Sequence, residues 1–481
     1  MRRRFVAVLS LGCSVAATIA VPARADRAPD VLLLTIDTLR PDYLSVNGYD
    51  RPTSPVLDAL ILSGWYFEDA ASPIGRTTPA LASLLTGAYP HSTRVRALWE
   101  NMPPEVVTLP QVLRAAGWRT LAVVTNNVLT TDRGLDRGFD IYDTAEDSRP
   151  ARVTTDKAIE QLARIPKDQP LFAWVHYIDP HVPYRSDPKI IQSFDPGYRS
   201  RYPLAFGWTP LPGEPAGPVK PFPDDLPKVD ATHRNHLPEN VVAHIRRLYA
   251  ADIRSADDEI GRLLAAFRAR SGKNLLVVFA ADHGESLGEH AYFFDHGDYC
   301  YEGEIRVPLA FSLPPSSRFA GKGYLSGRVS LVDVAPTLLE LLSVKASPEF
   351  ASRLEGRSLV PFLQGDSPPE RPVFGESGHA FYPEVVTRRV RNDVEGAFRC
   401  VVLGDWKLIW TPFQTGALEW ELYDLRKDPH ETHDLWRADQ PHFQELKPIL
   451  LEWAKAGKWK DEPSPIAERD LEKLRSLGYI K

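Results

Sequence analysis

An acidic residue and a histidine, Asp282-His283, follow the apolar run 275–279 and precede a glycine. A carboxylate and an imidazole in one tight turn can chelate a divalent cation. Asp37 follows another apolar run, 31–36, and would supply a third ligand. Taken singly, Asp37 could cap a helix and the Asp-His-Gly turn could be an ordinary loop. Taken together, the three side chains indicate a metal site.

Two adjacent threonines, Thr77 and Thr78, begin a short apolar segment that ends at Gly87. This pattern predicts a helix in which Thr77 or Thr78 is the cap and Pro79 lies in the first turn. The start of a helix has free N–H groups and a positive dipole end, which suit an anionic tetrahedral group. A hydroxyl there can be a nucleophile, because a metal ion lowers its pKa without a neighbouring base.

The candidate site residues follow short apolar runs in the sequence. The clearest are 31–36, 121–124, 171–175 and 275–279, and the amphipathic stretches 106–116 and 245–268 lie between them. Runs of this kind are typical of strands buried on both faces of a parallel sheet, so we expect an α/β fold. Ligands bind outside the carboxyl ends of such strands. Asp37, Asn126, His181 and Asp282-His283 are therefore expected to share one site.

The chain divides into three parts. We expect a signal peptide over 1–25, a catalytic domain over 26–365 and a small α+β subdomain over 366–481, with strands in 398–410 and 418–425 and a helix over 440–456. A stretch rich in Pro and Gly, 185–235, interrupts the alternation and is expected to shape the substrate pocket.

The leader begins with Arg2, Arg3 and Arg4, which are followed by an apolar stretch and an Ala-x-Ala cleavage pattern ending at Ala25. We therefore expect a secreted or periplasmic protein that has no membrane segment after cleavage. A lipid anchor at Cys13 and a retained N-terminal anchor are the alternatives. The 481 residues include only 3 Cys, which excludes a disulfide scaffold. After cleavage Cys300 and Cys400 remain, and they could pair in an oxidising compartment.

The net charge of the chain limits the kind of partner that it can bind. Residues 1–25 contain four Arg and no acid, so their removal changes the net charge from −6 to −10. Binding to a phosphate backbone needs a basic surface, so we expect no nucleic-acid partner. The oligomeric state is left open.

Longer motifs follow one another in the order 35–42, 79–91, 179–181, 282–290, 296–297, 306–308, 333–339, 404–408 and 421–425. Together they resemble the sulfatase family of the alkaline phosphatase superfamily over nearly the whole chain after the leader. The resemblance implies a large mixed, mostly parallel sheet flanked by helices, with a smaller C-terminal α+β subdomain. It also implies a metal-assisted hydrolase of sulfate esters.

The resemblance assigns roles by position. Asp37, Asp282 and His283 match metal ligands. His181 matches an anion-contacting or leaving-group acid position, His296 a histidine that lines the site, and Lys407 a lysine that contacts the anion; each of the last three could instead be structural.

One departure concerns the family's Cys/Ser-x-Pro-x-Arg signature, because Thr77 stands at its first position and Leu81 at its arginine. Formylglycine is made from Cys or Ser, and oxidising Thr would give a ketone, so we expect no formylglycine. Asn126 stands near the place of a Lys-x-His pair and could bind an anion oxygen neutrally. Thr at the nucleophile position resembles nucleotide phosphodiesterases and phosphoethanolamine transferases, but the latter carry membrane spans that this sequence lacks.

A single acid, Asp37, replaces the usual acid pair, which leaves fewer carboxylates for Ca²⁺. We expect one or two divalent ions, with Zn²⁺ or Mn²⁺ favoured over Ca²⁺ or Mg²⁺.

The sequence thus predicts an exported hydrolase of sulfate or phosphate esters, from small molecules or glycans, with Thr77 as the metal-activated nucleophile. His181 and Asn126 would steady the developing charge, and His181 or His296 would protonate the leaving group. The alternatives are a catalytically silent protein that binds sulfated or phosphorylated glycans, and a phosphoryl-group transferase.

Overall fold

The computed structural model describes residues 27–197, 239–377, 397–412, 418–456 and 466–476. Within these ranges, nine strands form one large sheet in the order β10-β2-β9-β6-β1-β5-β3-β4, and β11 pairs with β2. The strands are β1 (Asp30–Ile36), β2 (Trp65–Ala71), β3 (Arg119–Val124), β4 (Ile141–Asp143), β5 (Leu171–Tyr177), β6 (Leu275–Ala281), β9 (Arg306–Ser312), β10 (Gly323–Leu325) and β11 (Val329–Ser330). Only the pairs of β9 with β2 and β6 are antiparallel, so the expected mixed, mostly parallel sheet is confirmed.

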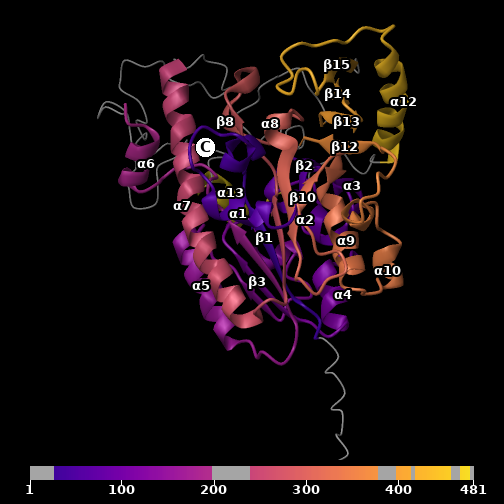
Figure 1. Cartoon of the computed structure of the whole chain (residues 1–481). Coiled ribbons are helices and arrows are strands. Elements are labelled where there is room, and N and C mark those ends of the chain that lie inside the picture. The colour runs from indigo at the N-terminus through magenta and orange to yellow at the C-terminus, as the bar shows by residue number, and fades with distance from the viewer. Residues whose placement is uncertain (1–26, 198–238, 378–396, 413–417, 457–465, 477–481) are drawn as a thin grey trace, which may run out of the picture.

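The four apolar runs in the sequence are the central strands. β1, β5 and β6 are buried along their whole length, because helices cover both faces of the sheet. Figure 1 shows α5 and α7 on one side, and α2, α4 and α9 on the other. The helices of this domain are α1 (Pro55–Leu62), α2 (Thr77–Thr86), α3 (Pro90–Thr93), α4 (Leu109–Ala115), α5 (Ala151–Arg164), α6 (Pro188–Phe194), α7 (Glu239–Ser271), α8 (Glu302–Ile305), α9 (Val334–Leu341), α10 (Pro348–Ala351) and α11 (Val360–Leu363).

An irregularity accommodates a proline inside the sheet. Pro308 lies on β9 between two neighbouring strands, although proline cannot donate a ladder hydrogen bond. The register between β9 and β2 shifts there: Leu309 pairs with Phe67 and Val307 with Ala70. The extra residue of β2 lies opposite Pro308, so the missing N–H falls at a bulge.

The C-terminal subdomain is an antiparallel sheet of β12 (Val373–Glu376), β13 (Arg399–Leu403), β14 (Trp406–Pro412) and β15 (Leu418–Asp424). Helix α12 (Pro441–Ala456) packs on β13 and β14, and Figure 1 shows it alongside this sheet. Helix α13 (Glu468–Ser476) returns to the large domain, where Asp470 Oδ1 lies 2.6 Å from the Arg133 guanidinium. The small hairpin of β7 (Ser286–Leu287) and β8 (Phe293–Asp295) lies between β6 and the subdomain in sequence.

The predicted signal peptide, 1–25, and most of the predicted excursion, 185–235, fall on residues outside the described ranges. At the start of that excursion, the Arg185 backbone N–H and the Ser186 hydroxyl both donate to Asp252 on α7, at 2.7 Å each. No helix within the described residues is both long enough and apolar enough to cross a membrane.

Candidate active site

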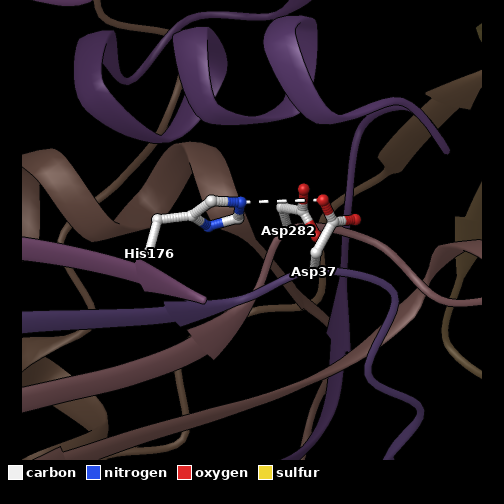
Figure 2. Close-up of side chains that lie close together, drawn as sticks. All are labelled: Asp37, His176 and Asp282. Atoms are coloured by element: carbon white, nitrogen blue, oxygen red, sulfur yellow. Dashed lines mark ion pairs between the residues drawn. The ribbon is translucent and has the colours of Figure 1, made fainter. Parts of the chain in front are cut away.

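Three buried side chains come together at the carboxyl end of the central strands. Ligand atoms of Asp37, His176 and Asp282 all lie within 4.8 Å of one another, and Figure 2 shows the three side chains facing one another. Among the described residues, Asp37 Oδ1, His176 Nε2 and Asp282 Oδ2 have no hydrogen-bond partner, although all three are buried. Buried polar atoms without partners are costly, so their convergence fits a cation held between them.

The sheet fixes these ligands. β5 and β6 both run parallel to β1, and the backbone of Asp37 donates to Tyr177 O at 2.9 Å while that of Asp282 donates to Ile36 O at 3.2 Å. His176 is the register partner of Thr35 on β1, and the Thr35 hydroxyl lies 2.9 Å from His176 Nδ1. That contact holds the imidazole so that Nε2 faces the carboxylates, as a metal-ligating histidine requires.

The charges of the group also fit a cation. Burial raises the pKa of Asp282 well above its ordinary value, and the negative charge of Asp37 adds to the effect. For Asp37, burial acts to raise the pKa, but His176, whose Nε2 lies 3.7 Å from Asp37 Oδ2, and the neighbouring His181 and His283 outweigh it, so the pKa is lowered. Two carboxylates here resist being ionised together without a cation. Two carboxylates and imidazole nitrogens are a donor set suited to Zn²⁺ or Mn²⁺.

Thr77 begins α2 beside this group. Its Oγ1 lies 3.4 Å from Asp37 Oδ2 and 3.3 Å from His283 Nε2, and its side chain is buried. The prediction that Thr77 or Thr78 caps the helix is wrong, because the N-cap is Arg76 and no side chain caps it. Thr78 instead donates to Leu98 O at 2.9 Å. The other helix signals are confirmed: Pro79 lies in the first turn, and the helix ends at a left-handed glycine.

Asn126 follows β3 and joins the same group, as predicted. Its Nδ2 donates to Asp37 Oδ2 at 2.7 Å, and its Oδ1 accepts from the Val128 backbone at 3.2 Å. The amide therefore orients a metal-ligand candidate, which is a role that the sequence did not suggest.

Three histidines surround the group. His283 Nδ1 lies 2.9 Å from Gly284 O, which leaves Nε2 toward the two carboxylates, 3.5 Å from Asp37 Oδ1 and 3.6 Å from Asp282 Oδ2. The His296 ring centroid lies 4.5 Å from that of His283 and 5.1 Å from that of His181. The sequence-predicted histidines are thus brought together.

Glu285 contacts one of these rings. Its Oε1 lies 3.2 Å from His296 Nδ1, and both side chains are buried. Burial lowers the pKa of His296 to about 4, and the charge of Arg76 contributes. His296 is therefore a neutral imidazole near pH 7.

Lys407 lies in a different environment. It is fully buried on β14, and its ammonium lies 2.8 Å from Glu302 Oε1 and 2.7 Å from Glu431 Oε1. Burial acts to lower its pKa, but the two carboxylates outweigh this and raise it. An anion contact for Lys407 stays a prediction, and the structure gives its ammonium two carboxylate partners instead.

Sequence reasoning missed His176 and Glu285. His176 ends an apolar run in the same way as Asp37 and Asn126 follow theirs, so its position was a usable signal. Glu285 lies inside the run that begins with Asp282, where its spacing alone does not show that it reaches His296.

The chain matches two protein-family models and is similar to known sulfatases. A family model described as "Sulfatase" matches residues 29–344, and one described as "N-sulphoglucosamine sulphohydrolase, C-terminal" matches 288–455. The chain is 24% identical to iduronate 2-sulfatase of Mus musculus, covering 86% of this chain and 92% of that protein. It is also 24% identical to choline-sulfatase of Rhizobium meliloti strain 1021, covering 94% and 91%.

Two solved structures share the fold. One is a protein in complex with its substrate D-glucosamine-2-N,6-O-disulfate, with a TM-score of 0.67 and 21% identity over 90% of this chain and 98% of that one. The other is the phosphonate monoester hydrolase of Agrobacterium radiobacter, with a TM-score of 0.67 and 21% identity over 89% and 95%.

Proposed function

Because this chain belongs to the sulfatase family, we propose that it is a metal-dependent hydrolase of sulfate or phosphate esters in which Thr77 is the nucleophile. The observation that carries the proposal is the position of Thr77 Oγ1, 3.4 Å from Asp37 Oδ2 and 3.3 Å from His283 Nε2 at the beginning of α2. A hydroxyl beside candidate metal ligands can attack sulfur or phosphorus.

Asp37, His176, Asp282 and His283 would hold the cation, for which Zn²⁺ or Mn²⁺ is favoured. When bound, such an ion lowers the pKa of a neighbouring hydroxyl and offsets negative charge on the ester oxygens. The N–H groups at the start of α2 lie beside Thr77 and favour an anionic group in the same place.

The leaving alcohol needs a proton. His296 has a pKa lowered to about 4 by burial and by Arg76, so it carries no imidazolium proton near pH 7. This favours His181 as the acid. Asn126 holds Asp37 in place through a hydrogen bond of 2.7 Å.

The threonine at position 77 affects whether a sulfate ester or a phosphate ester is the better substrate. We assign Thr77 to the first position of the family's nucleophile signature, where a threonine cannot become formylglycine. A sulfated threonine lacks the release route that a hydrated aldehyde provides, so the assignment favours phosphoryl esters. The relative solved with a disulfated glucosamine favours sulfated sugars. We further propose that residues 1–25 export the protein.

A screen of the purified full chain tests the proposal. Aryl sulfate, phosphate monoester, phosphodiester and phosphonate monoester substrates would be offered with Zn²⁺, Mn²⁺ or Ca²⁺. Thr77→Ala should lower kcat/KM by about 10³-fold or more. Thr78→Ala is the matched control, because its hydroxyl donates to Leu98 O; it should retain turnover within about tenfold.

Thermal unfolding gives the metal readout. Zn²⁺ or Mn²⁺ at about 100 times Kd should stabilise the wild type by about 2.7 kcal/mol, and Asp282→Asn should lose most of that shift. Equal turnover by wild type and Thr77→Ala would reject the nucleophile. Metal and glycan binding without turnover of any ester would instead support the silent binding protein, which the buried Leu81 at the signature's arginine position favours.

A further inference from the structure

Two cysteines that the proposed reaction does not use lie together. Cys300 follows the β8 strand of the large domain and Cys400 lies on β13 of the small sheet, and both side chains are buried. Both side chains belong to one buried cluster, and both are free thiols.

Their surroundings hold them in place. Both belong to one apolar cluster between the large domain and the small sheet, with Tyr292, Tyr299, Ile305, Phe398, Ile409 and Tyr423. Cys400 pairs across the sheet with Gly375 on one side and Ile409 on the other. A Cβ on Gly375 would lie 3.0 Å from Cys400 Sγ, so a side chain there would crowd the sulfur.

The two thiols differ in character. Interaction with Cys300 lowers the pKa of the Cys400 thiol, and the Lys407 charge also lowers it. Burial raises the pKa of Cys300 well above its ordinary value. Each thiol thus shifts the pKa of the other, as expected from their shared position in this cluster.

We propose that Cys300 and Cys400 are a disulfide-forming pair that ties the loop carrying His296 to the small sheet when the protein folds in an oxidising compartment. The oxidant is a small-molecule or protein disulfide. One of the two thiolates attacks a sulfur of that disulfide and releases one thiol. The other thiolate then attacks the cysteine sulfur of the mixed disulfide and releases the second thiol. The pair loses two protons and two electrons, and the oxidant becomes two thiols.

The pairing has to precede the closing of the cluster, because both sulfurs are buried once the chain is folded. Its consequence lies close to the active site. Between His296 and Cys300, the Gly297 N–H donates to Glu304, and Asp298 pairs with the Arg76 guanidinium at 3.0 Å. The disulfide adds a covalent fixed point four residues after His296.

Refolding of the full chain tests this, with Cys13→Ala as the background that leaves only the two cysteines. The protein would be unfolded with reductant, refolded in a glutathione and glutathione disulfide buffer, alkylated in denaturant and mapped by mass spectrometry. We expect one linked pair of peptides, protection of both cysteines from alkylation, and a urea midpoint that falls after reduction.

Serine variants complete the test. Cys300→Ser and Cys400→Ser should each leave one thiol that is alkylated or carries glutathione, and neither midpoint should respond to reductant. Alkylation of both cysteines in the refolded background protein, or glutathione on each separately, would overturn the proposal. These readouts do not depend on ester turnover, so they stand apart from the proposed function.

Discussion

Lys407→Met separates a structural role from an anion-contacting one. The Lys407 ammonium lies 2.8 Å from Glu302 and 2.7 Å from Glu431, in a fully buried position. Glu302 keeps a second cation after the change, because both of its carboxylate oxygens accept from Arg328, at 2.8 and 2.9 Å. Among the described residues, the contact recorded for the Glu431 carboxylate besides Lys407 is the neutral Glu302 backbone N–H, at 2.6 Å. The cost therefore falls on Glu431, and we expect a loss of about 3 kcal/mol in the free energy of unfolding.

The pH dependence of this loss has a definite sign. Burial raises the pKa of Glu431 to about 7 even though Lys407 acts to lower it, so removing Lys407 raises it further. Below about pH 7 both folded proteins hold this proton, and as pH rises the wild type releases it before the variant does. The variant's additional loss of stability therefore grows as pH rises above about 7. It should be small at pH 5 and larger at pH 8.

Urea unfolding followed by tryptophan fluorescence at both pH values is the assay. Lys427→Met is the matched control, because Lys427 pairs with Asp424 at 2.8 Å but is 82% exposed; it should cost no more than about 0.5 kcal/mol. Glu431→Gln added to Lys407→Met should recover part of the loss. An unchanged urea midpoint at pH 8, together with lost ester turnover, would refute this reasoning. That result would instead support a contact between Lys407 and the anionic group of the substrate.

Three further changes probe the core and the site. Leu81→Arg restores the signature's arginine in a fully buried position and should cost about 3 kcal/mol or more in urea unfolding; full stability would mean that the new charge finds an acid partner. Burial raises the pKa of Asp179 to about 6, and its Oδ2 is covered, so the folded state holds a proton that the unfolded chain releases. Relative to Asp179→Asn, the wild type should therefore lose about 2 kcal/mol between pH 4 and 6, and parallel stability profiles would contradict this. Gly297→Ala would place a Cβ 2.1 Å from Arg76 Nε, so it should lower both stability and turnover. Gly272→Ala is the control, because Gly272 also has a positive φ but no atom lies within 4 Å of the added Cβ. It should lower the free energy of unfolding by only about 1 kcal/mol. An equal loss for both variants would show that the contact with Arg76 is not the cause.

The central strands were predictable because burial on both faces makes their sequences continuously apolar. β1, β3, β5 and β6 all follow from such runs. β2 and β9 were not predicted as strands, because charged residues interrupt β2 and Pro308 interrupts β9. Those interruptions are tolerated at the bulge between the two strands, which depends on register and not on local sequence.

The site was predictable where a polar residue directly follows an apolar strand, as with Asp37 and Asp282. Contacts made across long sequence separations were not. The hydrogen bond from Asn126 to Asp37 and the two carboxylates around Lys407 depend on how distant segments pack. The capping prediction failed for a similar reason, since the Thr78 hydroxyl donates to a distant backbone oxygen and not to its own helix.

The position of β1 between β5 and β6 affects how the protein is made. β1 is the first strand of the described chain, yet about 245 residues separate it from its register partners on β6. At a synthesis rate of about 5 to 20 residues per second, β1 waits roughly 12 to 50 s for that neighbour. Long-range parallel pairing of this kind folds slowly and leaves apolar strands uncovered in the growing chain. We therefore expect the nascent protein to be prone to aggregation until β6 has emerged from the ribosome.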